Sequence, residues 1–355
     1  MQHKQEVILD IGRKSVKVLL MKKVGRDNHV VDFDIFETPE GLINTDDYIQ
    51  ILPEFSARLK ESMRKMNVKT RNMSVTIPNA GVIVREVTLP VVDESKLRSM
   101  IDMEIPQHFL LNLKDYVIDY KILGKTSAKD GAPQYSILLA AAPKGMIESY
   151  LLLAQASGLQ ISSIDFFGNS LSKLIRKEIV GEGAPSTVVT LDIGEFRTDV
   201  TISLNGMLKY TRSVMFGGED VRRTIIEAGG VSAEVAGDTA NEIDMIRFLK
   251  SYTGELTEAE KAVGRLVEGF VSEVTRIFDF YSSRDTQNRI DMVYLTGGYC
   301  GFKNLEALLS AEFAVKTSLF PEIAKFPVER RAEEFQKQRM LFANALGASL
   351  DWTVA

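Results

Sequence analysis

The sequence has few of the residues that build disulfides and metal sites. It contains one cysteine, Cys300, and three histidines, His3, His29 and His108. A lone cysteine excludes an intramolecular disulfide, and the scattered histidines lack the spacing of metal ligands. This composition favours a reducing compartment, so we expect a cytoplasmic protein.

Long apolar runs and basic clusters are also missing. No stretch approaches the roughly 20 apolar residues that a membrane-spanning helix needs, and the polar residues 1–6 predict no signal peptide. A formal net charge of −5, without a cluster of five or more Lys or Arg, predicts no nucleic-acid partner. Residues 341–355 carry only one charged side chain, Asp351, so we expect no direct membrane anchor there.

One internal similarity is present in this chain of 355 residues, which is long enough for two or more packed units. Val7–Gly12 reads VILDIG, and Val189–Gly194 reads VTLDIG. Each is a strand-like apolar run that ends in an Asp-x-Gly turn, and a second apolar run follows at 16–21 and at 200–204. The repeat predicts two similar β-hairpins with acidic tips.

Two further regions have a clear pattern. A strand at 292–295 ends at Thr296-Gly297-Gly298 and leads to a helix at 304–310, and helical spacing of apolar residues predicts a long helix over 263–281. The stretch 82–162 predicts a small α+β unit inserted in the first lobe. Its expected elements are strands at 82–89, 116–123 and 134–142 and helices at 94–104 and 144–157.

The two hairpins contain the residue types that a nucleoside triphosphate needs. Gly12 and Gly194 let the backbone approach phosphate oxygens, and Asp10 and Asp192 suit a hydrated Mg²⁺ ion. Lys17, seven residues after Asp10, can reach a phosphate. These residues predict that ATP or ADP binds with Mg²⁺ in a cleft between two lobes.

The order of these motifs resembles a known superfamily. Two Asp-x-Gly hairpins followed by a strand that ends in Gly-Gly are similar to the phosphate-1, phosphate-2 and adenosine motifs of actin and the sugar kinases. Within that superfamily, Ile83–Pro90 (IVREVTLP) and Leu138–Lys144 (LLAAAPK) resemble the PilM family, the actin-like, FtsA-related cytoplasmic proteins of type IV pilus assembly. The resemblance runs over nearly the whole chain.

The resemblance implies an α/β, actin-like ATPase fold of two lobes with an inserted α+β subdomain, called 1C. The division that it implies is subdomain 1A in 1–82, completed by connecting helices in 164–187 and 335–355; subdomain 1C in 83–163; subdomain 2A in 188–220 and 285–334; and subdomain 2B in 221–284.

The resemblance also implies roles for individual residues. The nucleotide contacts that it implies are Gly12, Ser15, Lys17, Gly194, Thr198, Glu273, Arg276, Gly297 and Gly298, and the magnesium contacts are Asp10 and Asp192. For Glu273 and Arg276 a solvated helix face is an equal alternative. Glu195-Phe196-Arg197 and Tyr299-Cys300 replace small residues of the family pattern, which predicts an altered approach of the phosphates.

One acid is a candidate for catalysis. The superfamily orients or deprotonates the attacking water from the connecting segment, which here is 164–169, and Asp165 is its only acid. A structural role for Asp165 is the alternative. We therefore expect slow or undetectable ATP hydrolysis.

The implied function is that of an ATP-binding component of a type IV pilus, or related secretion, assembly platform. Its implied partner is the short cytoplasmic tail of a PilN-like membrane protein, in a groove between subdomains 1A and 1C, which would hold the protein at the inner face of the cytoplasmic membrane. The alternatives are a sugar-kinase-like phosphotransferase and an FtsA- or actin-like filament-forming protein. No sugar-binding motif is evident, and self-association stays open.

Overall fold

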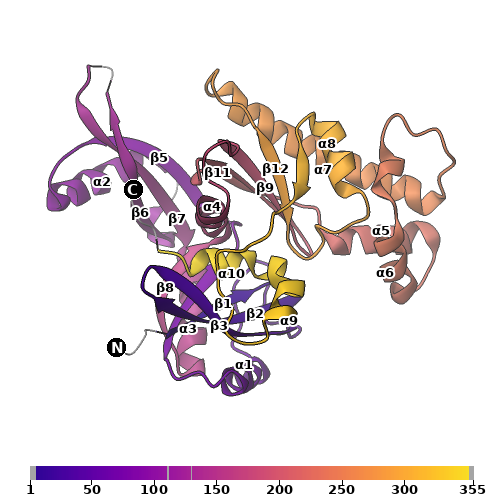
Figure 1. The fold of residues 1–355 in the computed structure, drawn as a ribbon, viewed down its shortest axis with the longest axis horizontal. Helices are drawn as coiled ribbons and strands as arrows, with labels where there is room; N and C mark the ends of the chain where they lie inside the picture. The colour runs from indigo at the N-terminus through magenta and orange to yellow at the C-terminus, as the bar shows by residue number, and fades with distance from the viewer. Residues whose placement is uncertain (1–4, 110–111, 129, 352–355) are drawn as a thin grey trace.

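The computed structural model describes residues 5–109, 112–128 and 130–351 (Figure 1). Residues 352–355, the end of the predicted connecting segment, and residues 1–4 lie outside them. The described chain forms two five-stranded sheets and one three-stranded sheet. Helices lie beside and between these sheets.

The first sheet has the strand order β3-β2-β1-β4-β8. β2 is antiparallel to both β1 and β3, whereas β4 is parallel to both β1 and β8. The strands span Gln5–Ile11 (β1), Ser15–Val24 (β2), Asp27–Glu37 (β3), Asn72–Ile77 (β4) and Gln160–Phe166 (β8). Along β1, Val7 and Leu9 pack in one core and Ile8 packs in another, because alternate side chains of a strand point to opposite faces.

The second sheet repeats this topology, with the order β11-β10-β9-β12-β13. β10 is antiparallel to its two neighbours, and β12 is parallel to β9 and β13. The strands span Thr187–Ile193 (β9), Thr198–Leu204 (β10), Met207–Val214 (β11), Met292–Thr296 (β12) and Thr317–Leu319 (β13). In both hairpins the turn is closed by a glycine N–H, from Gly12 to the Ser15 carbonyl and from Gly194 to the Arg197 carbonyl. The two predicted hairpins are thus confirmed.

The third sheet is antiparallel, with the order β5-β7-β6. Its strands are Ile83–Pro90 (β5), Tyr116–Ser127 (β6) and Pro133–Pro143 (β7), and a short 3-10 turn, Leu113–Asp115, precedes β6. One face packs against α2, Glu94–His108, in a core of its own. α2 was expected to end at Glu104, but it continues through Pro106, which removes a single backbone hydrogen bond near the end of the helix.

Two helices cover one face of the first sheet. They are α1, Pro53–Lys65, and α3, Lys144–Ser157, and both share the core of that sheet. The first sheet and these helices form the first lobe, so α3 belongs to it by packing, although α3 follows the strands of the predicted insertion. Gly158, at φ 74°, ends α3 in the left-handed region that glycine favours. The subdomain boundaries themselves stay a prediction.

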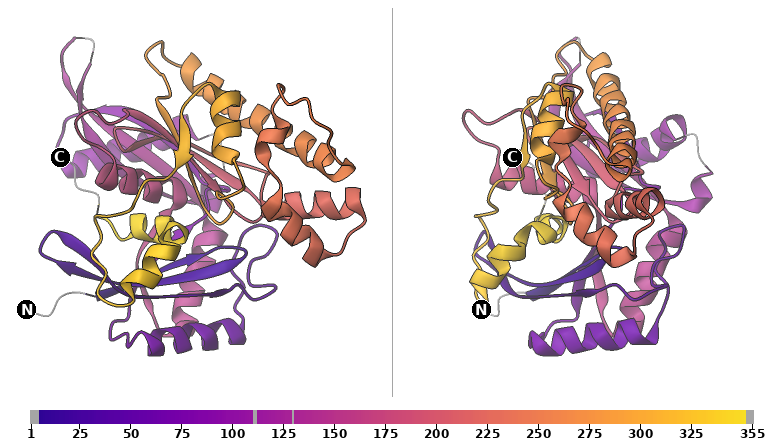
Figure 2. Two further views of the ribbon diagram at one scale, coloured as in Figure 1. Left: turned by 45° about the vertical axis from the view of Figure 1, so that its right-hand side comes forward. Right: turned by 90° about the vertical axis from the view of Figure 1, so that its right-hand side faces the viewer.

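The helices of the second lobe follow the chain order. They are α5, Gly218–Gly229, α6, Ala233–Glu242, α7, Glu258–Ser283, and α8, Leu305–Phe313, with a 3-10 turn at Met245–Phe248. α7 starts earlier than the apolar pattern predicts, because Thr257 and Glu260 cap it reciprocally: each accepts a hydrogen bond from the other's backbone N–H. Figure 2 shows α5 and α6, in salmon, at the outer end of the second lobe, whereas α8 lies beside the second sheet.

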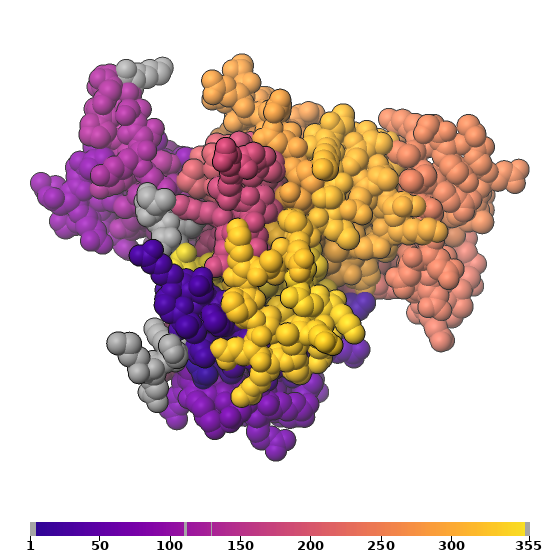
Figure 3. Space-filling model, in the orientation of Figure 1, coloured from indigo at the N-terminus to yellow at the C-terminus, as the bar shows by residue number. Residues whose placement is uncertain are grey.

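The two lobes meet through helices near the middle of the molecule. These are α4, Phe167–Glu178, α9, Ala332–Gln338, the 3-10 turn Arg339–Phe342, and α10, Ala343–Ala348. They share a core with Ile8 of β1 and Val188 of β9. The C-terminal segment, yellow in Figure 3, lies across the face where the lobes meet.

Candidate functional site

The tips of both hairpins face one cavity of about 510 Å³ between the lobes. The turn after β12 forms a third part of its wall. The sequence-predicted residues that line it are Asp10, Gly12, Ser15, Lys17, Asp192, Gly194, Gly297 and Gly298. The tertiary structure therefore brings together three motifs that are far apart in the sequence.

In the first hairpin, Asp10 and Lys17 face each other across β1 and β2. Lys17 Nζ lies 3.7 Å from Asp10 Oδ2, and the Asp10 residue is only 2% exposed. Burial raises the pKa of Asp10, and the charge of Lys17 opposes that rise. A Cβ at Gly12 would lie 3.0 Å from Lys17 Nζ, so glycine leaves room for the lysine head group.

In the second hairpin, the equivalent positions hold two acids, Asp192 and Asp199. Asn344 Nδ2 of α10 donates a hydrogen bond of 2.7 Å to Asp192 Oδ2. Burial raises the pKa of Asp192, and it raises the pKa of Asp199 to about 7. Gly297 has φ 92°, and a Cβ there would overlap Asp192 Oδ1, so only glycine fits this turn.

Three charged side chains outside the predicted site, those of Asp47, Arg13 and Arg197, meet at the mouth of the cavity, where both arginines are partly exposed. The carboxylate of Asp47 accepts hydrogen bonds from Arg13 Nη2 at 2.7 Å and from Arg197 Nη2 at 2.9 Å. Arg13 belongs to the first hairpin turn and Arg197 to the second. Arg197 departs from the family pattern only by its size, and Asp47 lies in a loop without a motif, so no local sequence signal predicts this contact.

Tyr299, directly after Gly297-Gly298, forms a second contact between the lobes. Its hydroxyl accepts hydrogen bonds from Lys14 Nζ at 2.8 Å and from Arg222 Nη1 at 2.6 Å, and it donates one to Glu195. A phenol oxygen has one donor and two acceptor sites, so this hydroxyl is fully satisfied. A Cβ at Gly218 would overlap the Tyr299 ring, which therefore lies directly on the start of α5.

Three predicted nucleotide residues do not line the cavity. Thr198 is buried, and its hydroxyl donates to the Phe216 carbonyl at 2.9 Å, which is a structural bond. Glu273 and Arg276 are exposed on α7. The structure places Glu273 and Arg276 on a solvated helix face, and the nucleotide contacts implied for these three residues stay predictions.

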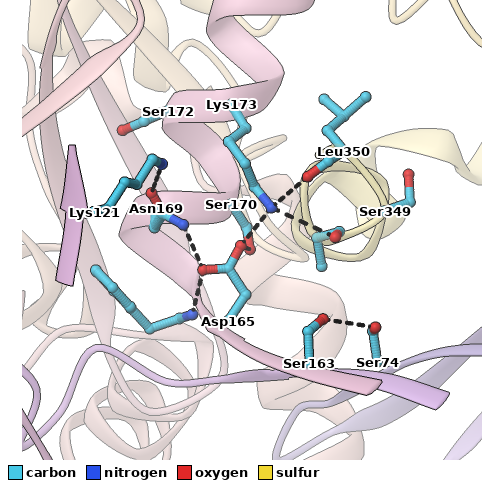
Figure 4. Close-up of polar contacts among 12 residues, drawn as sticks. Ser74, Lys121, Ser163, Asp165, Asn169, Ser170, Ser172, Lys173, Ser349 and Leu350 are labelled. Atoms are coloured by element: carbon cyan, nitrogen blue, oxygen red, sulfur yellow. Dashed lines mark hydrogen bonds and ion pairs between the residues drawn. The ribbon is translucent and has the colours of Figure 1, made fainter. Parts of the chain in front are cut away.

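Asp165, the candidate catalytic acid, is not among the residues that line the cavity. Figure 4 shows its polar contacts. Its Oδ1 accepts hydrogen bonds from the Phe166 N–H at 2.9 Å and from Asn169 Nδ2 at 2.7 Å. Its Oδ2 accepts one from Ser170 Oγ and pairs with Lys173 Nζ, both at 2.8 Å. Burial opposes ionisation, but Lys173 and these bonds hold the pKa of Asp165 below its usual value. These contacts agree with the structural alternative for Asp165, and its catalytic role stays a prediction.

The cavity floor fits a hydrated cation. Asp10 Oδ1, Thr296 Oγ1 and Asn344 Oδ1 are buried there without a hydrogen-bond partner in the described structure. Within the described ranges, no group of three or more His, Cys, Asp or Glu is placed to hold a metal by itself. Mg²⁺ usually retains several waters and binds substrate phosphates, so a few carboxylates are enough.

The charge of the cavity wall also bears on the ligand. The acidic residues that line it are Asp10, Glu37, Asp47, Asp192, Glu195 and Asp199, and the basic ones are Arg13, Lys14, Lys17 and Arg197. A polyphosphate would enter a wall with more acids than bases, so it needs an accompanying cation.

The family described as type IV pilus assembly protein PilM matches residues 8–352. This chain belongs to the PilM family. In the described part of this PilM-family chain, no helix is both long and apolar enough to cross a bilayer.

Solved structures confirm the actin-like ATPase fold of this PilM-family chain. A chain of a PilM-PilN type IV pilus biogenesis complex is 18% identical, with 98% of each chain covered and a TM-score of 0.79. MreB 5 of Spiroplasma citri bound to AMPPNP is 13% identical, with 98% of this chain and 95% of that chain covered and a TM-score of 0.52. The ethanolamine utilization protein EutJ from Carboxydothermus hydrogenoformans is 12% identical, with 98% and 90% covered and a TM-score of 0.54.

Proposed function

We propose that this PilM-family protein is a cytoplasmic component of a type IV pilus, or related secretion, assembly platform that binds ATP or ADP with Mg²⁺ between its lobes. The observation that carries the proposal is that Asp10, Asp192 and the Gly297-Gly298 turn meet in one cavity. MreB 5 with AMPPNP, a protein of the same fold, supports a nucleotide in this cleft.

The residues at the cavity have distinct roles in this proposal. Gly12, Ser15 and Gly194 expose backbone to the phosphates, and Lys17 offsets phosphate charge. Asp10 and Asp192 would hold a hydrated Mg²⁺, and its charge would compensate their buried carboxylates. Gly297 and Gly298 would lie beside the adenosine. The bound metal supplies charge neutralisation of the phosphates.

Hydrolysis is expected to be slow or absent. Both carboxylate oxygens of Asp165 are engaged in hydrogen bonds or an ion pair, and Asp165 does not line the cavity. We expect Asp165→Asn to lower the unfolding free energy while single-turnover ATP cleavage keeps the wild-type rate. A selective loss of turnover in a folded variant would restore Asp165 as the catalytic acid.

The proposed partner is the short tail of a PilN-like membrane protein, in a groove between subdomains 1A and 1C. The similar PilM-PilN complex supports this partner. Within the predicted subdomain 1C, exposed apolar side chains at Leu151 and Leu152 of α3 and Val117 of β6 supply area for an apolar tail. The partner would hold the protein at the inner face of the cytoplasmic membrane.

Titration with fluorescent ATP tests the cleft. Wild type would be compared in Mg²⁺ and in EDTA with Asp10→Ala and Asp192→Ala, and with Asp238→Ala on the exposed side of α6 as the matched control. We expect magnesium-dependent binding that both cleft variants lose and the control keeps, with circular dichroism confirming the fold. Wild type that binds no nucleotide would leave the partner groove alone as the functional site.

A further inference from the structure

The contact of Asp47 with two arginines has the geometry of an anion site. The nearest pairs are 2.7 Å for both Arg13 and Arg197, and each arginine comes from a different phosphate hairpin. The side chain of Asp47 is 9% exposed, and those of Arg13 and Arg197 are 25% and 18% exposed. All three line the nucleotide cavity. The two lobes therefore share one carboxylate at the mouth.

The charges of this group are unequal. Two guanidinium groups surround one carboxylate, and the second acceptor of Arg13 Nη2 is the neutral Asn44 carbonyl at 2.8 Å. Guanidinium groups bind carboxylates and phosphates with the same planar set of donors. A terminal phosphate carries more negative charge than a carboxylate, so it matches a pair of arginines better.

The other cations of the wall have different partners. Lys17 pairs with Asp10, and Lys14 donates to the Tyr299 hydroxyl. Asp47 itself has φ 64°, a left-handed conformation in which Asp is enriched among non-glycine residues, so this turn position suits an Asp residue.

We propose that Arg13 and Arg197 form a clamp for the terminal phosphate of a bound nucleoside triphosphate, and that Asp47 competes with this phosphate for the two arginines. The clamp rests on the proposed nucleotide function of the cavity. On binding, the phosphate replaces the Asp47 carboxylate between the arginines, and no covalent step is involved. The clamp distinguishes a triphosphate from a diphosphate, whose chain lacks the last phosphate group.

Because Asp47 would compete with the phosphate, removing the charge of Asp47 should raise the affinity for ATP. Asp47→Asn keeps the shape and an acceptor oxygen but removes the competing charge, so we expect it to tighten ATP binding roughly tenfold. Arg13→Gln and Arg197→Gln should weaken ATP roughly 10- to 100-fold and ADP by much less. Arg223→Gln, an exposed arginine of α5 outside the cavity, is the matched control and should bind like wild type.

The ligands are ATP, ADP and inorganic triphosphate, each with Mg²⁺, measured by displacement of a fluorescent nucleotide. Inorganic triphosphate that shows the same pattern as ATP supports a clamp for any triphosphate chain, and a pattern confined to ATP supports a clamp for nucleotides. Arginine variants that bind ATP like wild type, or an Asp47→Asn variant that binds it more weakly, would overturn the clamp.

The failure of the clamp and the failure of the nucleotide proposal give different results. If ATP binding depends on Mg²⁺ but the substitutions at Arg13 and Arg197 leave its affinity unchanged, only the clamp is overturned. Wild type and Asp47→Asn that both bind no phosphate compound overturn both proposals. Circular dichroism and Arg197→Lys, which keeps the charge without the planar donors, separate loss of the clamp from loss of the fold.

Discussion

Lys17 lies directly opposite Asp10 across β1 and β2, with its Nζ 3.7 Å from Asp10 Oδ2. In the equivalent register of the second hairpin, Asp199 lies opposite Asp192. The duplicated hairpins therefore differ in charge: one holds an ion pair, and the other holds two carboxyl groups. This difference leaves an excess of acid on the side of the cavity where a cation is proposed.

Replacement of Lys17 should destabilise the fold, because the buried carboxyl group of Asp10 would lose its ion-pair partner. We expect Lys17→Met to lower the unfolding free energy by about 3–5 kcal/mol, since loss of one partner of a buried pair leaves the other uncompensated. Urea denaturation at pH 8 measures the loss. The double variant Lys17→Met with Asp10→Asn should recover part of it. A double variant as unstable as the sum of the two single variants would show that the pair is not coupled.

Lys121 of β6 should give the stability a pH dependence above neutrality. Burial lowers its pKa from 10.5 to about 7, and the Asp165 charge opposes that shift. Between these values the unfolded chain holds a proton that the folded protein has released, so this residue makes stability rise with pH by at most about 1.4 kcal/mol per pH unit. Below pH 7 Lys121 is protonated in both the folded and the unfolded protein, so the full destabilisation from its buried charge is present.

The test is the difference in unfolding free energy between wild type and Lys121→Gln from pH 6.5 to 9.5. We expect wild type to gain stability relative to the variant as the pH rises. Lys125→Gln, an exposed lysine on the same strand, is the control and should follow wild type at every pH. A wild-type advantage that is constant with pH would show that Lys121 does not titrate in this range.

The Tyr299 hydroxyl should stabilise the contact between the lobes. Tyr299→Phe keeps the ring on Gly218 and removes the bonds to Lys14, Arg222 and Glu195, so we expect a loss of about 1–3 kcal/mol. Chemical denaturation measures it. No hydrogen bond of the Tyr294 hydroxyl is found in the described structure, so Tyr294→Phe serves as the control with an expected change near zero. Equal effects of the two substitutions would show that the Tyr299 hydroxyl does not stabilise the contact between the lobes.

The packing of α10 on α4 should depend on one glycine. A Cβ at Gly347 would overlap the Ser170 carbonyl, so we expect Gly347→Ala to cost about 1–3 kcal/mol or to prevent folding. Gly269 of α7 has open space around it, and Gly269→Ala should stabilise the helix by roughly 0.5–1 kcal/mol. Thermal unfolding of both variants provides the comparison. Two stabilised variants would contradict the close helix contact.

Local features of the site were predictable because neighbouring residues create them. The Asp-x-Gly repeat predicted both hairpins, and the Gly297-Gly298 turn predicted the third wall of the cavity. Glu273, Arg276 and Asp165 were assigned by position in a family pattern, and the structure places them outside the cavity. Whether a helix face is exposed, or an acid forms a buried ion pair, depends on which elements pack beside it. A short sequence motif does not contain that information.

The sequence by itself determined the two hairpins, the inserted strands and the membership of the PilM family, because strand periodicity, glycine turns and motif order are properties of short segments. Only the tertiary structure decided which side chains meet at the mouth of the cavity. Asp47 and Arg197 are separated by 150 residues, and Lys14 and Tyr299 by 285. Their contacts exist because two independently patterned lobes pack around α4 and α10, which brings charges together that no local sequence pattern connects.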